Sequence, residues 1–198
     1  MPGTNPQDHL SSRAKELWLN EPDPGPRSAR YAAADTNDAD GDAPQPANTR
    51  RPVNWVSTLY GYEEFWRENG RSPRENTRNL ATLPAEERRK GGWAGYQRKF
   101  EERLCRYQII RLDLSPAFEW DPQENIWQKN FAAYVHHLQR TGNPPYLNGA
   151  DSVEFALGRW FNRQLRQLQI DAQPKNRADQ LAVLLALLST TGAISHPR

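Results

Sequence analysis

The fold is decided by residues 127–166, which read WQKNFAAYVHHLQRTGNPPYLNGADSVEFALGRWFNRQLR. This stretch opens with four large apolar residues spaced at i, i+4, i+7 and i+11: Trp127, Phe131, Tyr134 and Leu138. Such spacing places all four side chains on one face of an α-helix. The segment 141–145 contains one glycine and two prolines and ends this helix, and residues 157–166 form a second helical run. We therefore expect two consecutive helices that share an apolar interior.

An earlier part of the chain repeats this pattern. The residues that match the opening helix lie 72 positions earlier: Trp55, Leu59, Tyr62 and Trp66. The same interval separates Gly70 from Gly142. The loop that follows this glycine is five residues shorter in the second copy than in the first. Beyond the loop, Trp93 therefore matches Trp160 at an interval of 67. A third helix is expected over residues 105–114 of the first copy, and a repeat of this length predicts two stacked three-helix units.

The first fifty residues differ in composition from the rest of the chain. They are rich in Pro, Asp, Asn, Ala and Gly, and their one sizeable apolar patch is Leu17-Trp18-Leu19. Such a segment buries too little surface to offset its chain entropy. We therefore expect disorder, apart from one helix from Ser11 or Ser12 to about Leu19. Three interpretations of this segment remain open. The apolar patch could dock a protein partner, the segment could compete with a ligand for the basic surface, or the helical turn could pack on its own domain.

These patterns predict an all-α protein: two tandem three-helix bundles behind a disordered N-terminal segment. The acidic leader covers residues 1–51, because the backbone before Pro52 disfavours helix. The first three-helix unit covers residues 52–121 and the second covers residues 122–198, with a junction near Asp121-Pro122.

The charge of the chain is unevenly distributed. Lys and Arg number 26 and Asp and Glu 24, a net charge of +2. Residues 1–50 carry five basic and eight acidic side chains, whereas residues 51–198 carry 21 and 16, a net charge of +5. Arginine outnumbers lysine 21 to 5. Arginine forks to phosphate and stacks on bases, which suits a nucleic-acid partner. Genome composition would produce the same bias.

Both copies carry a tryptophan-centred motif on the second helix. In the second copy it is Leu157-Gly158-Arg159-Trp160 followed by Gln164, and in the first it is Gly92-Trp93 followed by Gln97-Arg98. The first copy closes with Phe118-Glu119-Trp120-Asp121. Over residues 53–194 these motifs resemble the helicase-associated (HA) domain, which occurs as tandem repeats in bacteria, often after a helicase core and sometimes alone. The resemblance implies nucleic-acid binding.

Three features depart from the HA pattern. In the first copy a glycine directly precedes Trp93, with no residue between them. In the second copy Leu165 stands where arginine is expected, and the closing aromatic pair is absent. The chain also has no Gly-x-x-x-x-Gly-Lys-[Ser/Thr] motif, so we expect no helicase motor.

The candidate interface follows the second helix of each copy and the long loop of the first. Its residues are Arg74, Arg78, Arg89, Lys90, Gln97, Arg98, Lys99, Arg103, Arg159, Arg163, Gln164 and Arg166. Arg159, Arg163 and Arg166 share one helix face. Arginine there would contact phosphates, and arginine or glutamine would contact base edges. The alternative is a solvated face with ion pairs, such as Arg98 with Glu101 or Glu102.

The tryptophans divide into two groups. Those at regular helical positions are expected in the core: Trp55, Trp93, Trp127 and Trp160. A buried indole N–H needs an acceptor, often a loop carbonyl. Trp66 and Trp120, if exposed, could stack on a base.

No motif indicates catalysis, a metal or a cofactor. His136 and His137 are adjacent, so on a helix they point about 100° apart and cannot easily share a metal. No Ser/His/Asp, Cys/His or paired-carboxylate arrangement stands out. The single cysteine, Cys105, excludes an intramolecular disulfide and a cysteine-based zinc site.

We therefore expect a cytoplasmic, non-enzymatic protein that binds DNA, with RNA as a variant, and has no membrane association and no small-molecule substrate. The N-terminus lacks the apolar core of a signal peptide, and the longest apolar run is too short to span a bilayer. The alternative is an adaptor of phage or mobile-element type. It would dock a protein partner through an apolar surface or through Leu17-Trp18-Leu19.

Overall fold

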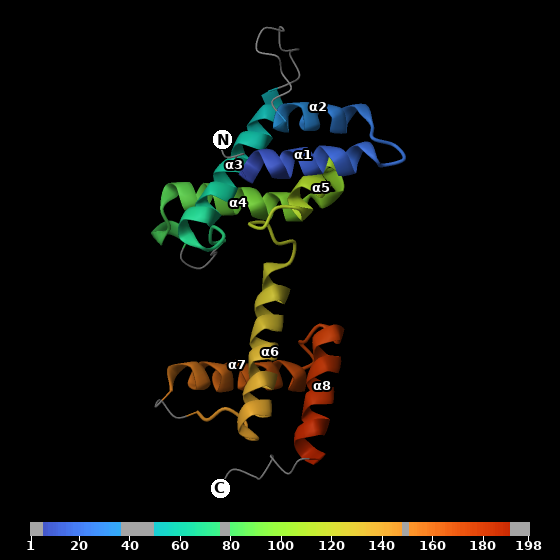
Figure 1. Ribbon diagram of the computed structural model, residues 1–198. Helices are drawn as coiled ribbons and strands as arrows, with labels where there is room; N and C mark the ends of the chain where they lie inside the picture. Colours follow the sequence, from blue (N-terminus) through green and yellow to red (C-terminus); the bar gives the residue numbers. More distant parts are fainter. Residues whose placement is uncertain (1–5, 37–49, 76–79, 148–150, 191–198) are drawn as a thin grey trace. The chain divides into compact units, whose positions relative to one another are not determined.

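The computed structural model describes residues 6–36, 50–75, 80–147 and 151–190, and every regular element within them is a helix (Figure 1). The all-α prediction is confirmed. The α-helices are α1 (Pro6–Leu19), α2 (Pro26–Asp35), α3 (Arg50–Asn69), α4 (Ala85–Lys99), α5 (Arg106–Asp113), α6 (Pro122–Thr141), α7 (Ser152–Gln169) and α8 (Lys175–Thr190), and the 3-10 helices are η1 (Leu80–Thr82) and η2 (Glu101–Arg103).

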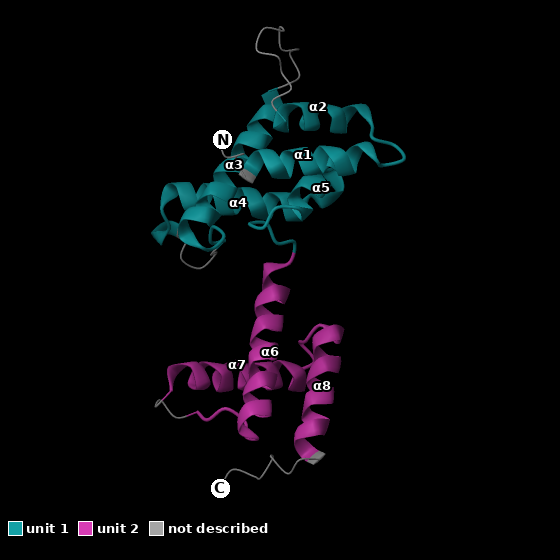
Figure 2. Cartoon of the chain, in the orientation of Figure 1, with its two compact units in different colours: residues 1–120 teal, residues 121–198 magenta. Residues whose placement is uncertain are grey.

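The chain divides into two compact units (Figure 2). Unit 1 covers residues 1–120 and contains α1 to α5, and unit 2 covers residues 121–198 and contains α6 to α8. The division falls beside Asp121-Pro122, the expected junction. In unit 2 this dipeptide starts α6, because the Asp121 side chain accepts a hydrogen bond from the Glu124 amide and Pro122 occupies the first turn.

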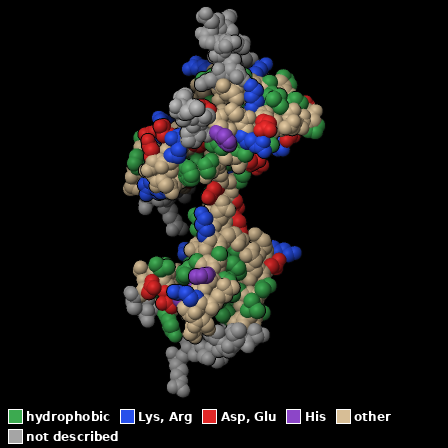
Figure 3. All heavy atoms as spheres, in the orientation of Figure 1, with side chains coloured by type: hydrophobic (Ala, Val, Ile, Leu, Met, Phe, Trp, Pro, Cys, Tyr) green, Lys and Arg blue, Asp and Glu red, His purple; other side chains and the backbone are tan. Residues whose placement is uncertain are grey.

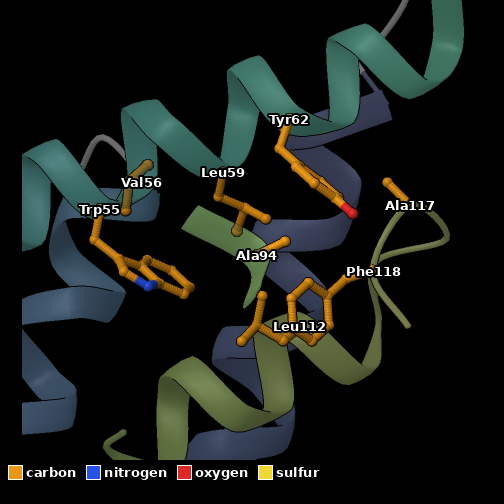
Figure 4. Close-up of a cluster of buried hydrophobic side chains, with 8 residues drawn as sticks. All are labelled: Trp55, Val56, Leu59, Tyr62, Ala94, Leu112, Ala117 and Phe118. Atoms are coloured by element: carbon orange, nitrogen blue, oxygen red, sulfur yellow. The ribbon is translucent and has the colours of Figure 1, made fainter. Parts of the chain in front are cut away.

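Helix α3 provides one wall of the core of unit 1. Figure 4 shows its inward face packed over α4, α5 and the segment after α5. The cluster contains Trp55, Val56, Leu59, Tyr62, Ala94, Leu112, Ala117 and Phe118. The apolar spacing in the sequence predicted this face. Helix α3 begins at Arg50, before the expected boundary, because proline is tolerated in a first turn, where its missing N–H has no intrahelical acceptor.

The expectation of a disordered leader is corrected for residues 6–36. Helices α1 and α2 fold against α5, where Ala14, Trp18 and Ala32 join Tyr107 and Ile110 in a second buried cluster of unit 1. The leader has too few apolar residues for a core of its own, but α5 supplies the missing surface. Residues 1–5 and 37–49 lie outside the described part of the chain.

A buried ionic network also ties α2 into unit 1. Arg111 of α5 is fully buried and donates to Asp35 of α2 at 3.0 Å and to both carboxylate oxygens of Glu63 of α3 at 2.7 and 2.9 Å. The Tyr107 hydroxyl donates to the same Asp35 oxygen at 2.6 Å. Because isolated buried charges are strongly disfavoured, these groups depend on one another. The carboxylate of α2 is thus part of the interior of unit 1.

Unit 2 is a three-helix bundle. Its core combines Trp127 and Tyr134 of α6, Trp160 and Phe161 of α7, and three leucines of α8: Leu181, Leu184 and Leu188. The third helix differs between the units. Unit 1 has the short α5 followed by the closing aromatics, whereas unit 2 has α8, an apolar helix of sixteen residues. Gly142 ends α6 with a positive φ of 70°, and Gly70 ends α3 with a φ of 64°. Both glycines adopt the left-handed conformation that other residues rarely take.

The interval of 67 residues pairs more positions than the tryptophan and the glutamine. Glu87 pairs with Glu154 and Gly91 with Gly158, so both second helices carry Glu-x3-Gly-x-Trp-x3-Gln. The glycine equivalent to Gly158 is therefore Gly91, and Gly92 stands between it and Trp93. A Cβ on Gly91 would lie 2.4 Å from the Arg74 carbonyl oxygen, and one on Gly158 would lie 3.1 Å from that of Pro145. Each glycine lets the preceding loop approach the helix.

Candidate nucleic-acid interface

The two glutamines expected at the interface lie in the cores. Gln97 is 4% exposed and Gln164 is 5% exposed. The indole N–H of Trp55 donates to Gln97 Oε1 at 3.0 Å, and that of Trp127 donates to Gln164 Oε1 at the same distance. The expected indole acceptor is therefore a side chain and not a loop carbonyl. We withdraw both glutamines from the interface, since a base edge has no access to them.

Two cations of the long first loop and α4 are held by carboxylates. Arg74 donates through Nε to Glu87 at 2.9 Å, and the Arg74 backbone amide donates to the same carboxylate at 3.0 Å. These bonds, together with one from Arg71, keep the pKa of Glu87 well below its ordinary value. Lys90 lies 2.6 Å from Glu86. Both cations have structural partners, and Arg78 lies outside the described residues.

Arg98 is also part of the structure of unit 1. It forms an ion pair with Glu75, rather than with the neighbouring Glu101 or Glu102, and donates to the Glu119 carbonyl at 2.8 Å. Its guanidinium lies 5.3 Å from the centre of the Phe118 ring. This arginine joins the long loop to the segment after α5.

Three predicted residues of unit 1 remain on the surface: Arg89, Lys99 and Arg103. Arg103 lies with its guanidinium 4.4 Å from the centre of the Phe100 ring, and Lys99 lies 5.4 Å from the same ring. Phe100 in turn packs on Tyr96, with ring centroids 4.6 Å apart. Tyr96 is 54% exposed, so this edge of α4 combines cations with an accessible aromatic ring.

In unit 2, α7 presents Arg159, Arg163 and Arg166 on one exposed face, as the spacing predicted. We call these three residues the arginine row. Arg159 lies 5.6 Å from the Phe155 ring, and none of the three forms an ion pair with a carboxylate in the described parts of the chain. Glu154, five residues before Arg159, instead accepts a hydrogen bond from the Tyr146 amide at 2.9 Å.

Sequence reasoning missed a second basic site because it lies partly in the supposed leader. Arg27 and Arg30 of α2, Arg51 of α3 and Arg103 of η2 line an open cavity of about 480 Å³, together with Tyr31 and Pro52. We call it the arginine pocket. The pair Arg27 and Arg30 has i, i+3 spacing, which would have indicated a shared face had a helix been expected there.

The remaining aromatic and histidine candidates have structural environments. Trp18 is buried, and its indole N–H donates to the Pro24 carbonyl at 2.7 Å, so the centre of Leu17-Trp18-Leu19 faces its own unit. Trp66 and Trp120 are partly buried against the core of unit 1. His137 is buried with Nε2 3.5 Å from Glu154, whereas His136 is exposed.

Comparisons with known proteins identify no relative: no family model, no curated protein and no solved structure matches the chain. In the described residues no group of three or more His, Cys, Asp and Glu side chains is placed to hold a metal ion. No helix among those residues is long and apolar enough to cross a membrane.

Proposed function

We propose that the protein binds nucleic acid, with DNA as the principal ligand, through the arginine row of α7. The observation that carries this proposal is the exposure of three arginines on one face of a helix without carboxylate partners among the described residues. At a rise of 1.5 Å per residue, Arg159 and Arg166 are about 10 Å apart along the axis. That distance corresponds to about three nucleotide steps of a duplex strand.

Charge also favours unit 2 as the binding unit. Unit 1 contains 18 basic and 18 acidic side chains, and unit 2 contains eight and six. Figure 3 shows basic and acidic side chains interspersed over the visible face of unit 1. Phosphate contacts of this kind supply affinity without sequence preference, and the affinity falls as salt rises because counterions are released.

The test is a salt titration of fluorescence anisotropy with labelled duplex DNA, single-stranded DNA and RNA. Changing the arginine row to glutamine should lower the affinity and reduce the salt slope by about 2 to 3, since each lost phosphate contact removes about 0.7 to 0.9. The control variant changes three other exposed cations, Arg13, Arg67 and Lys175, to glutamine and loses the same charge. Equal losses in both variants, or no binding at low salt, would refute the proposal.

The repeated motif supports a related proposal, that the two units are divergent HA domains. Glu87, Gly91, Trp93 and Gln97 match Glu154, Gly158, Trp160 and Gln164 of unit 2, so the repeat includes a glutamate and a glycine as well as the tryptophan and the glutamine. An HA domain structure should then show the same hydrogen bond from the tryptophan of its first helix to the glutamine of its second. A glutamine that faces solvent there would argue against kinship.

A second candidate function is that of a protein adaptor, and it rests on α8. Val183 is 62% exposed and Leu187 is 59% exposed, one turn apart on the same face. Exposed apolar surface of this kind marks protein-interaction sites when it is contiguous. A pulldown with and without nuclease distinguishes the two functions: a partner that survives nuclease and is lost on V183S/L187S favours the adaptor.

A further inference from the structure

The arginine pocket concentrates positive charge in a concave part of unit 1. Its lining comes from the first two turns of α2, the first turn of α3 and η2, and these three elements are separated along the chain. Four of its six described lining residues are arginines and none is acidic. Glu102 offsets part of this charge through an ion pair with Arg103 at 3.5 Å. The like charges that remain repel one another, which favours the binding of an anion among them.

Two of the four arginines are held in place by the protein itself. The Arg27 guanidinium donates to the backbone carbonyl of Arg103 at 2.6 Å, which links α2 to η2. The Arg103 side chain lies over the Phe100 ring. Arg30 and Arg51 are exposed, and no hydrogen bond or ion pair holds either of them among the described residues. The pocket therefore has a partly fixed frame and two guanidinium groups available to a ligand.

The chemistry of the lining favours a phosphate monoester. Such a group carries a charge of about −1.5 to −2 at pH 7 and three acceptor oxygens, which several arginine forks can engage together. A phosphodiester inside a strand carries one charge and continues in both directions, so a row of cations suits it better than a pocket. A volume of about 480 Å³ lies within the range of small-molecule sites and would also admit the attached sugar and base.

The pocket is continuous with the aromatic edge of α4. Arg103 lines the pocket and covers Phe100, and Phe100 packs on the exposed Tyr96. Aromatic rings beside cations are the usual platform for the bases of a single strand. A strand whose end lies in the pocket would therefore find Phe100 and Tyr96 along its next nucleotides.

We propose that the arginine pocket binds the terminal phosphate of a single nucleic-acid strand. This inference rests on the proposed function and deepens it. The arginine row supplies general affinity for phosphodiesters, and the pocket supplies recognition of an end. Arg30 and Arg51 contact the terminal phosphate, while Arg27 and Arg103 shape the cavity around it.

The test compares oligonucleotides of one sequence that end in a 5′-phosphate, a 3′-phosphate or only hydroxyl groups, by anisotropy at fixed salt. The full-length protein should prefer one phosphorylated end by about tenfold or more, the contribution of charge-assisted hydrogen bonds. In R30Q/R51Q this preference should disappear while binding of the hydroxyl-ended strand remains. In the control R13Q/R67Q, which loses the same charge, the preference should persist.

The pH dependence separates a terminal phosphate from a general charge effect. The second ionisation of a phosphate monoester has a pKa of about 6, so the preference should shrink as pH falls from about 7.5 to 5.5. Excess inorganic phosphate or a free mononucleotide should abolish the preference but leave hydroxyl-ended binding intact.

The outcomes distinguish the two proposals. Equal binding of phosphate and hydroxyl ends, or a preference that survives R30Q/R51Q, would overturn strand-end recognition alone. Absence of binding to every oligonucleotide would overturn the proposed function and this inference together. The arginine-row variant should bind all strands more weakly with the end preference unchanged, and loss of the preference there would also count against the pocket.

Discussion

Helices α4 and α7 carry the same Glu-x3-Gly-x-Trp-x3-Gln motif, yet they use their cations differently. On α4, Lys90 and Arg98 contact Glu86 and Glu75. On α7, the three arginines of the arginine row face outward without ion pairs in the described chain. The motif fixes glycine, tryptophan and glutamine contacts in both units, whereas the pairing of the surface cations depends on which acidic residues the helix itself and the preceding loop supply. Similar cores therefore coexist with different surfaces.

The two units also differ in what surrounds the repeated core. Unit 1 includes α1 and α2 and a buried ionic network, while unit 2 is completed by the apolar α8. Each of the following predictions changes one side of this comparison. Hydrogen exchange measured separately on peptides of α4 and α7 reports the stability of each unit, since a protein of two units need not unfold in one step.

The largest effect is expected at Arg111, which has no counterpart among the described core residues of unit 2. R111M leaves Asp35 and Glu63 buried without their cation and should destabilise unit 1 by about 3–5 kcal/mol. Exchange in α4 should rise steeply while exchange in α7 stays unchanged. Adding D35N and E63Q to R111M should restore part of the loss. A small effect of R111M would mean that the network is open to water.

The second largest effect is expected for alanine substitutions at the paired glycines Gly91 and Gly158, which should differ in their cost to stability. G91A places a methyl group 2.4 Å from a backbone oxygen, whereas G158A meets the nearest atoms at 3.0 and 3.1 Å. We expect G91A to cost about 1–3 kcal/mol, as overpacking does, and G158A to cost less. Comparison of the two exchange profiles tests this order. The reverse order would show that the loop before α4 yields more readily than the loop before α7.

The paired glutamines should lose the same indole bond, although Gln164 Oε1 also accepts a hydrogen bond from Gln173 Nε2 at 2.8 Å. Q97M and Q164M keep the volume of the side chain but leave the indole N–H of Trp55 or Trp127 without its acceptor. Each variant should lose about 1.5 kcal/mol in its own unit, within the range for an unsatisfied buried donor. Tryptophan fluorescence and exchange measure the loss. Neither variant should weaken DNA binding beyond its effect on folding, and a specific loss of binding would return the glutamines to the interface.

The smallest effect is a difference in acid sensitivity. The hydrogen bonds from Arg74 and Arg71 hold the pKa of Glu87 below its ordinary value of 4.5. The unfolded chain therefore takes up this proton first as pH falls, so the contribution of Glu87 is complete above about pH 5 and declines below about pH 4. In E87Q, the free energy of unfolding of unit 1 should fall less steeply as the pH is lowered from about 5 to 3. If the pH dependence of E87Q equals that of the unchanged protein, other carboxylates determine the acid sensitivity of unit 1.

The sequence anticipated the α3 and α6 faces, because a helical period of apolar residues leaves few other ways to bury them. It also anticipated the exposed arginine row, since Arg159, Arg163 and Arg166 recur at i, i+4 and i+7 and so share one helix face. It did not anticipate Gln97 and Gln164, because a polar residue beside arginines has the composition of a binding surface. Only the position of Trp55 and Trp127 in space showed that each glutamine accepts an indole hydrogen bond.

By itself the sequence determined the helical class and the repeated core, which follow from local spacing and from glycine and proline at the helix ends. Only the tertiary structure determined that α1 and α2 fold, because their few apolar residues form a core only when α5 packs against them. It alone decided which cations have carboxylate partners and that four arginines meet in one pocket. Ion pairing and pocket formation depend on distances between residues far apart in the chain, and local sequence patterns do not encode those distances.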